Sequence, residues 1–247
     1  VYQQFLLYIG NVLQGDLVPS IVYKDLTVSE LLAIGLPVSI SLGLKAILLA
    51  LTIGTCFGIL ASLYQNRAVD YFVMSFAMTG IAVPNFVIAP ILTLFFGIYL
   101  SLLPVAGWES WRSQILPVCA LALPQIAIIA RLMRASMIEV MRSNYIRTAR
   151  AKGLAESRVV RRHALRSAIL PLVSYLGPAI AGVVTGSVII EQIFNLPGVG
   201  RYFIQGALNR DYPLVLGIVI VYASAVIVLN LIVDIIYGFL DPKVKYE

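Results

Sequence analysis

Charged residues are scarce in this chain of 247 residues, because Asp, Glu, Lys and Arg together make up only 12% of it. Soluble globular domains carry about 25% of these residues. The mean hydropathy is +0.92, and hydrophobic residues make up 60% of the chain. This composition excludes an ordinary soluble domain and predicts a membrane protein.

Residues that perform metal, redox or nucleophilic chemistry are also few. The chain has one histidine, His163, and two cysteines, Cys56 and Cys119, whose spacing is not that of metal ligands. We interpret both cysteines as small apolar residues of the spans and expect no metal and no cofactor. An intramembrane serine protease would need a histidine near its serine, and an aspartyl protease would need two aspartates in the membrane, where only Asp234 is expected. The sequence therefore predicts no catalytic residue.

A P-loop is missing as well. No stretch matches the pattern G-x-x-x-x-G-K-[S/T], whose backbone amides and lysine hold nucleotide phosphates. We therefore expect that this chain does not bind ATP by that route, and that any energy from ATP reaches it through a partner.

Apolar residues come in runs of about 20 or more, the length that a helix needs to cross a bilayer. Runs such as "AILLALTIGTCFGILASL" are apolar all round and lack the alternation of outer-membrane β-strands. We therefore predict an all-α, polytopic transmembrane helix bundle. Its five expected spans cover residues 36–62, 71–99, 115–138, 168–190 and 213–240.

Lys and Arg are distributed unevenly among the segments between these spans. Eleven lie in residues 63–70, 141–167 and 241–247, whereas four lie in the remaining segments. Because Lys and Arg favour the cytoplasmic side, we expect the C-terminal tail in the cytoplasm and residues 1–35 and 191–212 outside. The chain then starts outside without a recognisable signal peptide, so we expect that a first span is missing from it.

The loop 141–167 alone holds eight of the eighteen Lys and Arg residues. Its composition is helical, and Gly153 interrupts it where a helix would commonly end. We expect a short helix over residues 143–152, a turn at Gly153 and a second helix that enters the membrane near Leu165. A basic surface helix of this kind binds either anionic lipid or a groove on another protein, and the pattern alone favours neither.

The stretch "NYIRTARAKGL", followed by "RVVRRHALRSAILP", resembles the signature loop of ABC importer permeases of the oligopeptide and dipeptide branch. The general importer pattern begins Glu-Ala-Ala, with a Gly four positions after the second Ala. Here Arg147–Ala149 and Gly153 stand at those positions, and the Glu is absent, as expected of the peptide branch. The segments "GDLVPS", "IAVPNFVIAP", "EQIFNLPGVGRYF", "NRDYPLV" and "NLIVDIIYGFLDPKV" are similar to that branch in the same order. The long segment "GDLVPSIVYKD" favours its oligopeptide member over the dipeptide or nickel members.

This resemblance implies the permease fold of ABC type I importers, with residues 36–240 as the transmembrane domain, and oligopeptide transport across the cytoplasmic (inner) membrane of a bacterium. It implies a homologous sister permease subunit, two ATP-binding subunits and an extracytoplasmic substrate-binding protein as partners, within a lipid bilayer and without nucleic acid. Coupling to the ATP-binding subunits would involve Arg147, Thr148, Ala149, Arg150, Ala151, Lys152, Gly153 and Leu154. The alternatives are a dipeptide, nickel or glutathione importer of the same branch and an ion-coupled secondary transporter, which would show internal repeats.

Some polar residues within the spans are candidates for the transport pathway. Lys45 is expected near the middle of the bilayer, and Asn85 and Gln125 follow Pro84 and Pro124 directly. A proline inside a helix frees a backbone carbonyl, which in lipid needs a partner or a watery cavity. We expect Lys45, Asn85 and Gln125 to line the pathway, with ordinary packing kinks as the alternative for the two prolines.

Two further polar residues, Asn230 and Asp234, lie one turn apart near the end of the last expected span. We interpret them as structural, with an interhelical hydrogen bond or an ion pair from Asp234 to Arg131 or Arg134. A functional role for an intramembrane carboxylate is the alternative. The segment "NLPGVGRYF" in loop 191–212 is interpreted as an external turn, because no strand precedes it as in a phosphate-binding loop.

Overall fold

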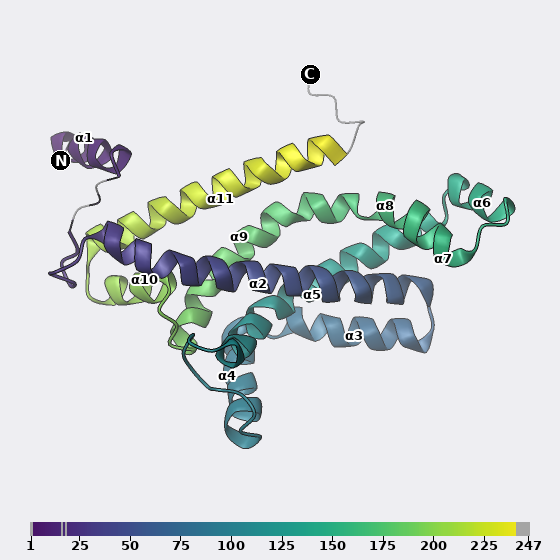
Figure 1. The fold of residues 1–247 in the computed structure, drawn as a ribbon, viewed down its shortest axis with the longest axis horizontal. Coiled ribbons are helices and arrows are strands. Elements are labelled where there is room, and N and C mark those ends of the chain that lie inside the picture. The colour runs from purple at the N-terminus through teal and green to yellow at the C-terminus, as the bar shows by residue number, and fades with distance from the viewer. Residues whose placement is uncertain (1, 16, 18, 241–247) are drawn as a thin grey trace. The chain divides into compact units, whose positions relative to one another are not determined.

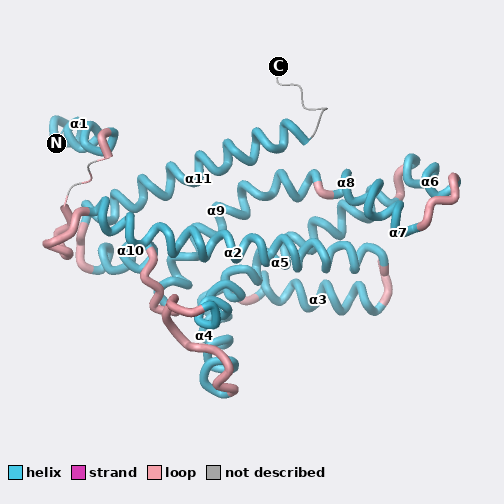
Figure 2. Tube along the Cα trace, in the orientation of Figure 1, coloured by secondary structure: helices cyan, strands magenta, loops and turns pink. Residues whose placement is uncertain are grey.

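The computed structural model describes residues 2–15, 17 and 19–240. Helices dominate this part of the chain, and its one β-type contact is an isolated bridge between Pro19 and Thr27 (Figures 1 and 2). The elements are α1 (Tyr2–Leu13), α2 (Val28–Leu63), α3 (Ala68–Ala82), α4 (Asn85–Leu92), η1 (Thr93–Tyr99), α5 (Trp111–Met141), α6 (Asn144–Ala151), α7 (Glu156–Arg158), η2 (Val159–Ala164), α8 (Leu165–Ala168), α9 (Leu170–Ile193), α10 (Val199–Leu208) and α11 (Tyr212–Leu240). The expected cytoplasmic tail 241–247 lies outside the described residues.

Four described helices, α2, α5, α9 and α11, are long and apolar enough to cross a membrane. A fifth span results if the bent pair formed by α3 and the α4–η1 segment counts as one. The predicted all-α transmembrane bundle is therefore confirmed. The spans expected at 115–138, 168–190 and 213–240 correspond to α5, α9 and α11, with no end shifted by more than four residues.

The span expected at 71–99 is not one continuous helix. Helix α3 ends at Ala82, and α4 begins at Asn85. Val83 has an extended backbone, with φ −108° and ψ 123°. This break has a local cause, because Pro84 offers no amide hydrogen and its ring disfavours the helical conformation at the residue before it. Pro124, in contrast, does not interrupt the chain's course, since α5 continues through it.

The first span begins at Val28, eight residues before the expected start at residue 36. Thr27 and Glu30 explain this start, because they bond to each other at the helix N-terminus. The Glu30 amide donates to the Thr27 hydroxyl over 3.2 Å, and the Thr27 amide donates to the Glu30 carboxylate over 2.7 Å. This reciprocal arrangement is a capping box, and the sequence "TVSE" contains its signature.

The described chain divides into two compact units. Unit 1 consists of the described residues within Val1–Leu44, Asn85–Ala120 and Val184–Ile227, and unit 2 of those within Lys45–Pro84, Leu121–Val183 and Val228–Glu247. Each of the four long helices contributes residues to both units.

Unit 1 has a core made of branched aliphatic side chains. The buried members are Leu17, Val28, Leu31, Leu32, Val199, Leu214 and Ile218. Partly buried aromatic residues, among them Tyr23, Tyr202 and Phe203, pack against this cluster. The start of α2, helix α10 and the start of α11 are therefore held together by apolar contacts within the unit.

Unit 2 packs through small residues. A Cβ atom at Gly54 would lie 2.9 Å from the carbonyl oxygen of Ile126, and one at Gly58 would lie 2.7 Å from that of Ala130. Both distances are too short for a side chain, so α2 and α5 approach each other closely at these glycines. Small residues at helix contacts are typical of membrane proteins.

Candidate functional site

Helix α6 in loop 141–167 has two different faces. Ile146 and Ala149 are buried, with exposed fractions of 0% and 6%, whereas every other residue of the helix is exposed. Residues three apart lie on the same side of a helix, so α6 packs through this pair and presents its other residues, including Arg147, outward. The expected helix at 143–152 is confirmed within one residue at each end. Ala149 points into the protein, which removes it from the face that a partner could reach.

Gly153 ends the helix in the way that the sequence predicts. Its φ is +74°, a value that residues with a side chain rarely adopt. The Gly153 amide donates to the Arg150 carbonyl over 2.9 Å, and the Leu154 amide donates to the Ala149 carbonyl over 3.4 Å. A Cβ atom at Gly153 would meet nothing within 4 Å, so the demand for glycine comes from the backbone alone.

An ion pair closes the turn that follows α6. Arg150 donates two hydrogen bonds to the Glu156 carboxylate, from Nη2 over 2.6 Å and from Nε over 3.1 Å. The Arg150 guanidinium lowers the pKa of Glu156 below its usual range, and Glu156 raises the pKa of Arg150. Both side chains are solvent-accessible, with exposed fractions of 42% and 55%, so the pair contributes at most about 1 kcal/mol to stability. Its effect is to fix the direction of α6 relative to α7.

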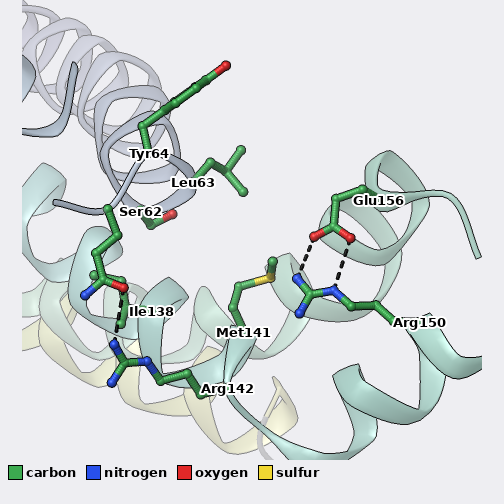
Figure 3. A pocket seen from close by; sticks show the side chains of 9 residues that line it. Ser62, Leu63, Tyr64, Ile138, Met141, Arg142, Arg150 and Glu156 are labelled. Carbon is green, nitrogen blue, oxygen red and sulfur yellow. Dashed lines mark hydrogen bonds and ion pairs between the residues drawn. The ribbon is translucent and has the colours of Figure 1, made fainter. Parts of the chain in front are cut away.

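A cavity of about 400 Å³ lies beside this ion pair. The turn after α2 and the end of α5 form its other walls, through residues such as Tyr64, Ile138 and Arg142. Figure 3 shows Arg150 and Glu156 facing each other at the rim and Arg142 joined to a neighbouring side chain, which is the amide of Gln65 at 3.3 Å. The loop 141–167 therefore borders a hollow with both polar and apolar walls.

The second helical segment of the loop starts at Glu156 with α7 and continues through η2 and α8. This segment includes Leu165, near which the sequence predicts that a second helix enters the membrane. The η2 segment is a π-helix, in which one turn contains an extra residue and the helix locally widens. Its residues Val159 and Ala164 are buried, so this segment packs against the protein while its arginines remain accessible.

An ion pair between half-buried Arg134 and buried Asp70 fixes the turn between α2 and α3 to α5. Arg134 donates to the Asp70 carboxylate from Nε over 2.7 Å and from Nη2 over 2.6 Å, and the Asn66 amide donates to Asp70 over 2.9 Å. Asp70 is 1% exposed. Asp70 falls in the segment 63–70 between two expected spans, and Arg134 is a candidate partner of Asp234, so the sequence does not predict this pair. A carboxylate is favoured in the first turn of a helix, where Asp70 lies, but this local preference does not indicate Arg134 as its partner.

The three residues proposed for a transport pathway lie in different surroundings. Lys45 is exposed on α2, and Asn85 is half-buried at the first position of α4. Gln125 is buried in unit 2, where its amide oxygen accepts a hydrogen bond from the Tyr175 hydroxyl over 2.8 Å. This hydrogen bond accounts for a polar side chain at that position without a substrate.

Asn230 and Asp234 both lie on α11 within unit 2. The side-chain oxygen of Asn230 occupies the space that a Cβ atom at Gly177 would need, so α9 and α11 meet closely there. Asp234 is exposed on its helix. The guanidinium of Arg134, one of the two partners considered for Asp234, is bound by Asp70 instead.

Loop 191–212 is not the simple turn that the sequence predicts, because it contains helix α10. Asp211 follows this helix and is fully buried. Its Oδ2 accepts hydrogen bonds from the Ser20 hydroxyl over 2.5 Å and from the amides of Ile21 and Val22 over 3.1 Å each. Its Oδ1 accepts from the Leu214 amide over 3.2 Å. Burial alone would raise the pKa of Asp211, but these hydrogen bonds lower it below its usual value.

Comparison with known proteins identifies the family. The model of the family described as "Binding-protein-dependent transport system inner membrane component" matches residues 54–246. The chain belongs to this family. It is therefore an inner-membrane permease component, and its expected membership among ABC importer permeases is confirmed.

Relatives of this permease match along its whole length. It is 51% identical to the oligopeptide transport system permease protein OppB of Haemophilus influenzae and 49% identical to that of Escherichia coli, covering 100% of this chain and 81% of each relative. The dipeptide transport system permease protein DppB of Bacillus subtilis is 42% identical over 98% of this chain and 79% of that protein.

Solved structures show the same fold at low sequence identity. A structure of the MetNI methionine ABC transporter in inward-facing conformations matches with a TM-score of 0.74 and 16% identity, over 85% of this chain and 96% of that one. An amino acid ABC transporter crystallised with histidines matches with a TM-score of 0.59 and 19% identity, over 87% and 95% of the two chains. These likenesses support the fold of the permease and carry no information on its substrate.

Proposed function

We propose that this permease moves oligopeptides inward across the bacterial inner membrane, driven by ATP hydrolysis in partner subunits. The observation that carries the proposal is the identity of 49% to 51% with oligopeptide transport permeases over the full chain. The lower identity of 42% to a dipeptide permease favours oligopeptides and makes dipeptides the alternative substrate. The chain itself performs no covalent chemistry in this scheme.

The exposed face of α6 is the proposed contact with an ATP-binding subunit. It offers Arg147, Thr148 and Ala151, and Lys152 follows directly as the C-cap residue. The turn at Gly153 sets where the helix ends. An amphipathic helix of two turns fits a groove on another protein through one face, while Ile146 and Ala149 hold the other face to the permease. Movement of the ATP-binding subunits would reach the spans through this packed face and through α7, which Arg150 and Glu156 keep in a fixed direction.

The proposed complex contains a homologous sister permease, two ATP-binding subunits and an extracytoplasmic substrate-binding protein. The family's description as a binding-protein-dependent system supports the last of these. Loop 141–167 and the C-terminus lie in the cytoplasm, and loop 191–212 lies outside. The concentration of basic residues in loop 141–167 supports this orientation.

Affinity purification in mild detergent, followed by reconstitution into liposomes, tests the function. We expect a sister permease and ATP-hydrolysing subunits to copurify, and we expect labelled oligopeptides to accumulate when ATP and binding protein are supplied. Uptake of dipeptides alone would favour the alternative. Uptake that follows an ion gradient without ATP would refute the proposal.

Labelling with an impermeant thiol reagent in intact cells tests the orientation separately. Single cysteines in the exposed part of 200–210, for example Leu208→Cys, should react from outside, because Leu208 is 77% exposed. Cysteines in 145–165, for example Lys152→Cys, should react only after the membrane is opened. The reverse pattern would refute both the orientation and the coupling role of loop 141–167.

A further inference from the structure

The N-terminus of α10 is capped in an unusual way. The cap residue, Gly198, has an extended backbone and no side chain that could accept hydrogen bonds from the first turn. The amides of this turn are nevertheless bound, because the Val199 amide donates to the Ser39 hydroxyl over 3.0 Å and the Gly200 amide donates to Glu191 Oε2 over 2.7 Å. Ser39 belongs to α2 and Glu191 to α9, so two other helices supply the cap that α10 lacks.

Glu191 is completely buried, with an exposed fraction of 0%. A buried carboxyl group needs hydrogen-bond partners, and the first turn of α10 supplies a donor to it through the Gly200 amide. Besides the Gly200 amide, the hydroxyls of Ser39 and Ser187 and the Arg201 amide face this carboxylate. The side chain is thus the centre of a polar cluster in unit 1, where an apolar residue would otherwise be expected.

The surrounding backbone is shaped to admit the carboxylate. A Cβ atom at Gly198 would collide with Glu191 Oε2 and would lie 2.8 Å from the Ser39 hydroxyl. A Cβ atom at Gly200 would lie 2.9 Å from Glu191 Oε2 and 2.5 Å from Val188 Cα. Glycine is therefore required at both positions, because the Glu191 side chain lies too close to the backbone there for another side chain to fit. The two glycines of "NLPGVG" thus make the space that this carboxylate occupies.

We propose that Glu191 is a positioning residue for transport, which ties α10 to α9 and α2 through its acceptor oxygen so that the three helices move as one. Tyr202 and Phe203 of α10 pack against the core of unit 1, and Asp211 connects the segment after α10 to residues 20–22. Alternating access needs an outer end that opens and closes as a unit, and α10 is held at both ends by buried carboxylates.

Glu191 holds α10 through the oxygen that accepts the hydrogen bond from the Gly200 amide, and this role does not require a negative charge. Glu191 Oε1 and the Tyr222 hydroxyl have no hydrogen-bond partner among the described residues, and the two groups face the same cluster. A glutamine at position 191 has nearly the same size and shape and can keep its side-chain oxygen at the Gly200 amide. Glu191→Gln should therefore preserve the anchor, and Glu191→Leu, of similar size without an acceptor, should release it.

Hydrogen exchange measured by mass spectrometry on the purified complex tests the anchor directly. In Glu191→Leu, we expect exchange of the peptide containing residues 199–202 to become about tenfold faster, because the first turn of α10 loses its cap and frays. Glu191→Gln should exchange like the wild-type protein. Glu109→Gln, which removes an exposed carboxylate in loop 100–110, is the matched control and should change nothing.

Two milder variants keep the test decisive if Glu191→Leu does not accumulate in the membrane. Ser39→Ala removes one acceptor and should accelerate exchange at the same peptide about threefold. Gly198→Ala should act in the same direction because its methyl group displaces the carboxylate, whereas Gly10→Ala, at a helical glycine with nothing within 4 Å, should not. Unchanged exchange in Glu191→Leu, or in both milder variants, would overturn the proposal.

Peptide uptake by the reconstituted complex tests the role in transport. We expect Glu191→Leu to lose about tenfold in uptake at normal abundance and normal ATP-subunit content, and Glu191→Gln to retain wild-type uptake, since only the first loses the acceptor. A Gln variant as defective as the Leu variant, or loss of uptake in proportion to abundance, would contradict the positioning role. The uptake assay rests on the proposed function, whereas the hydrogen-exchange assay does not. If the wild-type complex takes up no peptide, the proposed function fails, and hydrogen exchange still tests whether Glu191 holds α10.

Discussion

Loops 141–167 and 191–212 both contain a short helix, but they hold it in opposite ways. Helix α6 is attached by two buried apolar residues and steered by an exposed ion pair. Helix α10 is fixed by fully buried carboxylates before and after it, which bind backbone amides. The first arrangement leaves most of the helix accessible to a partner. In the second arrangement, the polar groups at the ends of the helix are bound within the permease. Helix α6 therefore keeps a face accessible for a partner, whereas α10 is fixed within the permease.

The largest effect should follow from removing the carboxylate after α10. Asp211→Ala leaves the Ser20 hydroxyl and three amides without their acceptor, and we expect it to lower the free energy of unfolding by about 3 kcal/mol. Thermal unfolding of the purified complex measures this loss. Asp25→Ala, an exposed aspartate in the segment before α2, is the control and should change the unfolding temperature little. Similar losses in both variants would mean that Asp211 is no anchor.

A change at Gly153 should affect coupling more than stability. Gly153→Val forces a β-branched residue to a φ of +74°, which costs about 1–2 kcal/mol in the left-handed region and tilts the end of α6. We expect membrane insertion and pairing with the sister subunit to remain, while peptide-stimulated ATP hydrolysis falls. Gly107→Val is matched, because Gly107 has a φ of +92° and a Cβ atom there meets nothing within 4 Å. Equal loss of stimulation in both variants would show a general cost of strain rather than a coupling role.

The ion pair beside Gly153 should give a smaller effect that a charge exchange reverses. Arg150→Glu and Glu156→Arg each place like charges together, and each should reduce stimulated ATP hydrolysis severalfold, consistent with an exposed pair worth about 1 kcal/mol or less. The double variant restores the attraction with the signs exchanged, so it should recover most of the activity. Recovery would show that the ion pair acts by orienting α6. If Arg150 instead contacts a partner directly, the double variant should not recover.

Changes of pH within the neutral range should have the smallest effect on stability. The pKa values of Asp211 and Glu156 are lowered in the folded protein, so the stability they contribute is fully present above their ordinary values of about 4. This stability disappears only as the pH falls through the lowered values. The difference in unfolding temperature between wild type and Asp211→Asn should therefore be constant from about pH 6 to 8 and shrink below about pH 4. A steep change between pH 6 and 8 would contradict this assignment.

The sequence allowed the class of fold and the short helix before Gly153 to be predicted, because span length and glycine punctuation are local signals. It failed where tertiary contacts decide. The partner of Arg134 is Asp70, 64 residues away, and neither residue marks the other in the sequence. Likewise, the sequence around α10 indicates a turn, because no neighbouring residue provides a capping signal. The cap comes from Ser39 and Glu191 on other helices.

Photo-crosslinking from single positions in the two loops tests the central contrast most directly. A photoreactive residue at Lys152, next to α6, should crosslink to an ATP-binding subunit in the assembled complex, whereas one at Leu208, which is 77% exposed on α10, should not. An ATP-binding subunit captured from Leu208 but not from Lys152 would contradict this contrast.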